Sequence, residues 1–175
     1  MIDELLTLAE ELARREQSVA KRRAISTAYY AAFHALCELV ADAFISDRKS
    51  KMYERIYRHI EHSAVNNPDL FRISDNQSEN FGNVRDLLLN LRQSREIADY
   101  SPRSNDAPLD AEFAVAEARN IVEIIRSIQS EDRYNLALNI LLGGGRKTKS
   151  THNSITPQTA RKNTSLVKPR RSKSP

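Results

Sequence analysis

The chain has 175 residues, 40% of them hydrophobic, which is enough for one domain with a single buried core. Its net charge of +4 is unevenly distributed. Residues 143–175 hold nine Lys and Arg and no Asp or Glu, while residues 1–142 hold the other 18 basic and all 23 acidic residues and carry a net charge of −5. One cysteine, Cys37, excludes a disulfide framework, and we expect it to be a small buried hydrophobic residue. With no signal peptide and no run of about 18 apolar residues, we expect a cytoplasmic protein with no membrane partner.

Apolar residues recur at helical spacing through the first half of the chain and predict three helices. The first covers about 2–16, where acidic residues near the start suit the positive end of the helix dipole. The second covers about 18–45, and the third covers about 48–64 and ends at breaker residues 66–69. The second helix carries alanines whose short side chains would let a neighbouring helix approach closely: Ala24, Ala28, Ala31, Ala32 and Ala35.

The second half of the chain predicts two further long helices and a short one. The fourth covers about 78–98 and must stop by Ser101, because Pro102 disfavours helical geometry in the residue before it. After a loop to Pro108, a fifth helix begins near Asp110, and a sixth around Tyr134 to Leu142 ends before three glycines. The sequence therefore predicts an all-α bundle of five to six helices over residues 1–142. Residues 143–175 have too few apolar side chains to offset the entropy of ordering, and we expect a disordered basic tail.

Two segments in the first half hold polar side chains that could carry chemistry. Tyr30 and His34 lie one turn apart on the second helix, so they could form a catalytic polar pair or could be partly buried groups satisfied by neighbouring helices. The segment from Arg55 to His62 includes Arg58, His59 and His62 on overlapping faces. These side chains could bind a phosphate or titrate near neutral pH, or they could form a solvated helix surface. Two histidines without a carboxylate at ligand spacing do not indicate a metal site.

A third candidate lies at the end of the fourth helix, where Arg95, Asp99 and Tyr100 follow one another. Arg95 and Asp99 are one turn apart and could form an ion pair within the helix, but base before acid is the less favourable order, which favours tertiary partners. An arginine fixed by a carboxylate beside a tyrosine could hold a phosphate or stabilise a phosphodiester transition state. There is no Gly-rich phosphate loop, no His-Glu-x-x-His and no Cys-x-x-Cys, so no cofactor is indicated.

Together these segments resemble the HEPN superfamily, in particular a bacterial family of this type. The similarity rests on residues 22–36, with Tyr29-Tyr30-Ala31-Ala32-Phe33-His34 at their centre, on residues 57–62, and on Arg95-Glu96-Ile97-Ala98-Asp99-Tyr100-Ser101-Pro102. It covers most of residues 1–145 and leaves the basic tail outside.

The resemblance implies a helical bundle that commonly forms a homodimer, with a cleft between the second and fourth helices. Many HEPN proteins are metal-independent ribonucleases, often toxins paired with a nucleotidyltransferase-type antitoxin, and others are inactive and bind nucleotides or RNA. Arg95 matches the arginine of the ribonuclease members. Their histidine, four to six residues later, has no counterpart here, so His62 or His34 would have to replace it across the bundle.

Three functions follow from these observations. The chain could cleave RNA with Arg95 at the scissile phosphate, Asp99 orienting it and a histidine as acid or base. It could be a non-catalytic dimer that binds a nucleotide, RNA or a nucleotidyltransferase partner, with Tyr30, His34 and Arg58 as ligand-binding residues. The domain could also be a scaffold whose tail contacts nucleic acid electrostatically, although a merely solubilising tail fits the same composition.

Overall fold

The computed structural model describes residues 1–67, 71, 78–102 and 110–143, and in these residues the protein is helical without any strand. Its elements are α1 (Ile2–Ala13), α2 (Ser18–Asp42), α3 (Lys51–His59), the 3-10 helix η1 (His62–Asn66), α4 (Ser78–Tyr100), α5 (Ala111–Ser127) and α6 (Ser130–Gly143). The predicted all-α bundle is therefore confirmed. The predicted disordered tail lies outside the described residues, apart from Gly143, which is the last residue of α6.

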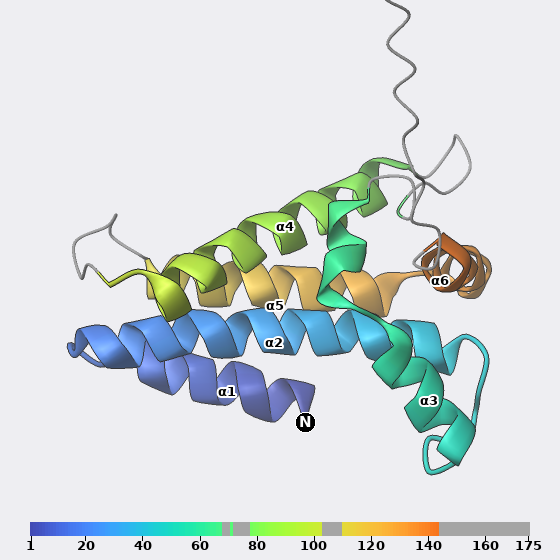
Figure 1. The fold of residues 1–175 in the computed structure, drawn as a ribbon, viewed down its shortest axis with the longest axis horizontal. Coiled ribbons are helices and arrows are strands. Elements are labelled where there is room, and N and C mark those ends of the chain that lie inside the picture. Colours follow the sequence, from blue (N-terminus) through green and yellow to red (C-terminus); the bar gives the residue numbers. More distant parts are fainter. Residues whose placement is uncertain (68–70, 72–77, 103–109, 144–175) are drawn as a thin grey trace, which may run out of the picture.

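The long helix α2 is the centre of the bundle. It contacts each of the other five α-helices, with α1 and α4 on opposite sides of it and α5 behind it in the view of Figure 1. The five alanines singled out in this helix are all buried, with exposed fractions of 0–3%. Because an alanine methyl group leaves room beside the backbone, this helix can be surrounded on several sides at once.

The third predicted helix is wrong in one respect, because it is two elements rather than one. The helix α3 ends at His59, Ile60 and Glu61 are extended, and η1 follows from His62. Ile60 and Val65 are both buried, yet residues five positions apart on one α-helix point about 140° away from each other. The break lets both side chains enter the core, and it turns His62 back towards α2.

Local sequence explains several of the helix boundaries. At the start of α3 the Ser50 side chain accepts a hydrogen bond from the Tyr53 N–H, and at the start of α5 the Asp110 side chain accepts one from the Phe113 N–H. The helix α4 ends at Tyr100, as Pro102 requires. The helix α6 begins earlier than expected, at Ser130, because its acidic first turn suits a helix N-terminus but interrupts the apolar pattern.

One described helix, α2, is long and apolar enough to cross a membrane by length and composition alone. Of its most apolar window, 78% is buried inside the bundle, and this is also the pattern of the core helix of a soluble protein. Cys37 lies on this helix, is buried and free, and has its pKa raised to about 12 by burial. It is thus a buried hydrophobic residue, as expected.

Candidate functional site

A series of polar side-chain contacts joins α2 to the end of α4. Arg22, Ser26 and Tyr30 follow one another at four-residue spacing and therefore share one face of α2. Arg22 donates hydrogen bonds to the carbonyl oxygens of Ala98 and Ser101, at 3.1 and 2.8 Å, and so satisfies acceptors that the last turn of α4 leaves without helical partners. The Ser26 hydroxyl donates to Asp99 Oδ1 at 2.5 Å.

Arg95 takes part in this series of contacts through both helices. Its Nη2 donates to the Tyr30 hydroxyl at 2.8 Å, and its Nε lies 2.8 Å from Asp99 Oδ2. The Nε–H is not aligned for a hydrogen bond, so the contact with Asp99 is an ion pair. The Tyr30 and Tyr100 rings both lie 5.5 Å from the guanidinium carbon. Asp99 and Tyr30 thus fix the orientation of a side chain that is only 20% exposed.

The guanidinium keeps part of its hydrogen-bonding capacity. An arginine has five N–H donors, and among the described residues nothing accepts a hydrogen bond from Arg95 Nη1. Burial disfavours the charge, but the hydrogen bond to Tyr30 and the nearby Asp99 outweigh this and raise the pKa of Arg95. A fixed cation with free donors is suited to bind a phosphate oxygen.

His62 lies on the other side of Tyr30. Its ring stacks on Phe33 with a centroid distance of 3.9 Å, and its Nδ1 forms a 2.7 Å hydrogen bond with the Tyr29 hydroxyl. The Tyr30 ring meets it edge to face at 6.0 Å, so Tyr30 contacts both His62 and Arg95. Among the described residues Nε2 of His62 has no hydrogen-bond partner, and the residue is exposed.

Two arginines influence the protonation of His62. Desolvation lowers the pKa of the imidazole, and the positive charges of Arg95 and Arg92 lower it further. Arg92 also holds η1 in place, since its Nη1 donates to the His62 carbonyl oxygen and to Asn66 Oδ1, both at 3.0 Å. His62 is therefore a neutral base at neutral pH, with one ring nitrogen fixed and the other open.

An open groove lies beside Arg95 along the outer face of α4. Ile97, Tyr100 and Ser101 line it, together with Gln93 and Glu96. Tyr100 is 73% exposed, so its ring offers a flat apolar surface next to the guanidinium.

The structure brings five of the seven predicted site residues together, namely Tyr30, His62, Arg95, Asp99 and Tyr100. The other two lie elsewhere. His34 forms a 2.6 Å hydrogen bond through Nδ1 with the Tyr57 hydroxyl, and Arg58 pairs with Glu54 on the surface of α3. Tyr30 and His34 are neighbours, with ring centroids 6.4 Å apart, but each has a separate tertiary partner. His62 is also separated from Arg58 and His59 by the break after α3.

Several residues of this site were not predicted from sequence: Arg22, Ser26, Tyr29, Phe33 and Arg92. A signal for the first two was present, because polar residues recur at four-residue spacing along one side of α2, at positions 22, 26, 30 and 34. Nothing comparable marks Tyr29 and Phe33, whose aromatic side chains are typical of a helix core.

In the described part of the chain, no three His, Cys, Asp or Glu side chains gather closely enough to hold a metal ion. Comparisons with protein-family models, with curated proteins and with solved structures find no match. The HEPN resemblance therefore rests on the motifs in residues 22–36, 57–62 and 95–102, and on nothing else.

Proposed function

We propose that this chain is a HEPN-type ribonuclease that holds an RNA phosphate at Arg95 and cleaves the chain without a metal cofactor. The observation that carries the proposal is the state of Arg95, which is fixed by Tyr30 and Asp99 while its Nη1 donors remain free. The neutral imidazole of His62 on the other side of Tyr30 supplies the base that the segment after Arg95 lacks.

Each group has a definite role in this proposal. In the tautomer whose Nδ1–H donates to the Tyr29 hydroxyl, His62 Nε2 accepts the proton of the ribose 2′-hydroxyl, and the 2′-oxygen attacks the phosphorus. Arg95 stabilises the negative charge that develops on the phosphate oxygens. The bond to the 5′-oxygen breaks, that oxygen takes a proton from solvent, and a cyclic phosphate remains. Asp99 touches no reacting atom and acts as a positioning residue for Arg95, while Tyr100 offers its exposed ring to a neighbouring base.

Incubation of the purified protein with total RNA in excess chelator tests the proposal. We expect cleavage by the native chain and a loss of about 100-fold or more for Arg95→Ala and for His62→Gln. Arg23→Ala, which removes an exposed arginine from α2, is the matched control and should cleave normally. Intact RNA with the native chain, or cleavage unaffected by Arg95→Ala, would contradict the proposal.

A second candidate function is binding without cleavage. Asp99 pairs with Arg95 at 2.8 Å, at a place in the chain where the ribonuclease members have their histidine. Because an aspartate is a poor acid or base near neutral pH, Asp99 does not replace that histidine in cleavage, whereas binding does not need it. In this case the same site around Arg95 would hold a nucleotide, RNA or a nucleotidyltransferase partner. A ligand-dependent rise in melting temperature without RNA turnover would favour this function over the first.

The proposal includes a cytoplasmic homodimer and a nucleotidyltransferase-type antitoxin as its partner. The homodimer and the antitoxin come from the HEPN resemblance, which implies that two copies of the site adjoin across a dimer. Sedimentation measures directly whether the homodimer forms. A chain that stays monomeric at all concentrations, yet cleaves RNA, would show that the activity does not require a dimer.

A further inference from the structure

A cavity lies where the start of α1, the second half of α2, the end of α5 and the start of α6 come together. Its volume is about 370 Å³, within the range of roughly 300–1,000 Å³ typical of small-molecule sites. No residue of the Arg95 site lines it. Charged side chains dominate its lining, namely Asp3, Glu38, Asp42, Arg48, Arg126 and Arg133. Such a cavity is suited to a small polar molecule.

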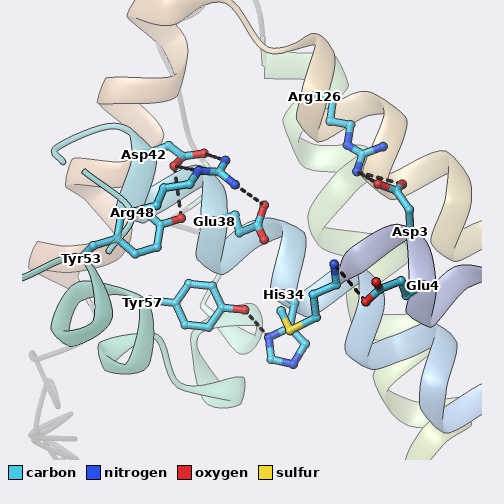
Figure 2. Close-up of polar contacts among 10 residues, drawn as sticks. Asp3, Glu4, His34, Glu38, Asp42, Arg48, Tyr53, Tyr57 and Arg126 are labelled. Atoms are coloured by element: carbon cyan, nitrogen blue, oxygen red, sulfur yellow. Dashed lines mark hydrogen bonds and ion pairs between the residues drawn. The ribbon is translucent and has the colours of Figure 1, made fainter. Parts of the chain in front are cut away.

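Four of these six side chains are paired with one another. Arg48 donates two hydrogen bonds to Asp42, from Nε to Oδ1 at 2.9 Å and from Nη2 to Oδ2 at 2.5 Å. The Tyr53 hydroxyl donates to the same Oδ1 at 3.1 Å. Across the cavity, Arg126 Nη2 lies 3.0 Å from both carboxylate oxygens of Asp3. Figure 2 shows both pairs, and neither carries a net charge.

Glu38 and Arg133 are the two charged side chains that remain. Glu38 Oε2 lies 3.5 Å from Arg48 Nη1, which is long for a charged contact, and in the described part of the chain Oε1 has no partner. Arg133 Nη2 donates to the carbonyl oxygen of Ile128 at 3.3 Å, but no described carboxylate pairs with this arginine. Its Nε is buried without a hydrogen-bond partner. The guanidinium is thus held at the end of α5 while its Nη1 donors stay unused.

The cavity therefore offers one unpaired side-chain charge of each sign. The amino group of Met1, which also lines it, has its own partner in Glu4 at 3.4 Å. The side chain of Glu38 is only 26% exposed, and Arg133 is half-buried. In such a partly desolvated place, an added opposite charge stabilises each group more than it would at an exposed surface. An anion would serve Arg133 alone and a cation Glu38 alone, whereas a zwitterion serves both.

We propose that this cavity binds a free amino acid, whose carboxylate accepts hydrogen bonds from Arg133 and whose ammonium group donates to Glu38. The planar guanidinium matches a carboxylate closely, and a carboxylate is a strong acceptor for an ammonium group. Because Glu38 belongs to α2 and Arg133 to α6, the ligand would join two helices and stabilise the folded chain. This binding does not depend on the proposed ribonuclease activity.

Calorimetric titration of the full chain tests the site. The probes are glycine, β-alanine and 4-aminobutanoate, which place the two charges progressively further apart. We expect saturable binding of at least one of them, together with a rise in melting temperature. The carboxylic acid and the amine of the same length should bind at least about tenfold more weakly, because each lacks one of the two charged contacts.

Two variants distinguish a binding role from a structural one. Glu38→Gln should weaken binding of the amino acid about tenfold and remove its advantage over the acid, while Arg133→Gln should remove its advantage over the amine. A variant that folds poorly would weaken all three ligands alike and leave these preferences unchanged. Glu123→Gln and Arg23→Gln remove exposed charges outside the cavity and should leave the affinity as it is.

The proposal has clear contrary outcomes. It would be overturned if none of the three amino acids bound at millimolar concentration, or if the matching acid or amine bound as tightly as the amino acid. Preferences that stay the same in the Glu38 and Arg133 variants would also overturn it. RNA cleavage by these two variants should remain normal, since neither residue belongs to the Arg95 site, so this proposal and the ribonuclease can fail separately.

Discussion

Asp99 links the end of α4 to α2 through polar contacts. It is 17% exposed, accepts a hydrogen bond from Ser26 and pairs with Arg95. Asp99→Ala would remove the ion pair of Arg95 and the shorter of the two hydrogen bonds of the Ser26 hydroxyl in a partly buried place, so we expect it to lower the free energy of unfolding by about 1–3 kcal/mol in urea denaturation. Glu96→Ala is the control, because the Glu96–Arg92 pair is more exposed and should contribute about 0.5 kcal/mol or less. Equal decreases for the two variants would show that Asp99 stabilises the fold no more than a surface pair does.

Two histidines, His34 and His62, predict a pH dependence of stability. Desolvation lowers the pKa of both in the folded chain. Below their ordinary value of about 6.5 the unfolded chain therefore binds more protons than the folded one. The stabilising contribution is fully present above pH 6.5 and is lost as the pH falls through the lowered pKa values.

Urea denaturation between pH 5 and 7.5 measures this effect. We expect His34→Gln and His62→Gln each to flatten the decline of stability towards acid pH, whereas His59→Gln, at an exposed position, should not. A native chain whose unfolding free energy rises on acidification over this interval would contradict the prediction.

Some side chains of the site could be predicted from the sequence and others could not. Arg95 and Asp99 were recognisable because their order along the helix is the unfavourable one, which indicates tertiary partners, and Ser26 and Tyr30 are those partners. The position of His62 could not be predicted in the same way. Its place beside Phe33 depends on a chain reversal between α3 and η1 that no glycine or proline marks.

At the scale of helices and turns, η1 is the short element that positions His62. Its anchor is Val65, which is completely buried, and Arg92 fixes its backbone from α4. Val65→Ala should lower the free energy of unfolding by about 1.5–3 kcal/mol, since it removes buried methyl groups and leaves a cavity. Val19→Ala is the matched control, because Val19 is 71% exposed and the same change should have almost no effect.

The same variant tests the link between this element and the candidate site. Loosening η1 should reduce RNA cleavage under conditions where the domain remains folded, because the imidazole would no longer be held at a fixed distance from Tyr30. A decrease in stability without any change in cleavage would place His62 outside the mechanism.

Periodicity predicted the number and order of the helices well because apolar residues recur at helical spacing in each of them and few breakers lie inside them. It failed at 60–61, where the apolar pattern continues although the backbone does not. Ile60 and Val65 can both be buried only if the helix ends between them, and this is a condition of tertiary packing rather than of local sequence. Boundaries with a chemical marker, such as Asp110 and Pro102, were close to their observed positions.

At the scale of the whole molecule, charge divides the chain into an acidic part and a basic part. Residues 1–142 carry a net charge of −5, which disfavours the approach of a polyanion to the domain, whereas the proposed function requires Arg95 to hold an RNA phosphate. The nine basic residues after position 142 would supply the long-range attraction, and they include no aromatic side chain for base stacking. In the proposed ribonuclease the tail would thus recruit RNA and the Arg95 site would act on it.

Removal of residues 144–175 separates these two roles. We expect the shortened chain to bind RNA more weakly at low salt and with a shallower dependence on salt concentration, by about 0.7 in the logarithmic slope for each phosphate that the tail neutralises in the full chain. Cleavage at saturating RNA should persist, since α6 and the rest of the bundle remain intact. Arg95→Ala in the full chain should show the converse, with the salt dependence kept and cleavage abolished. An unchanged affinity and slope after the deletion would mean that the tail does not bind RNA, and that the domain overcomes its own negative charge through the Arg95 site alone.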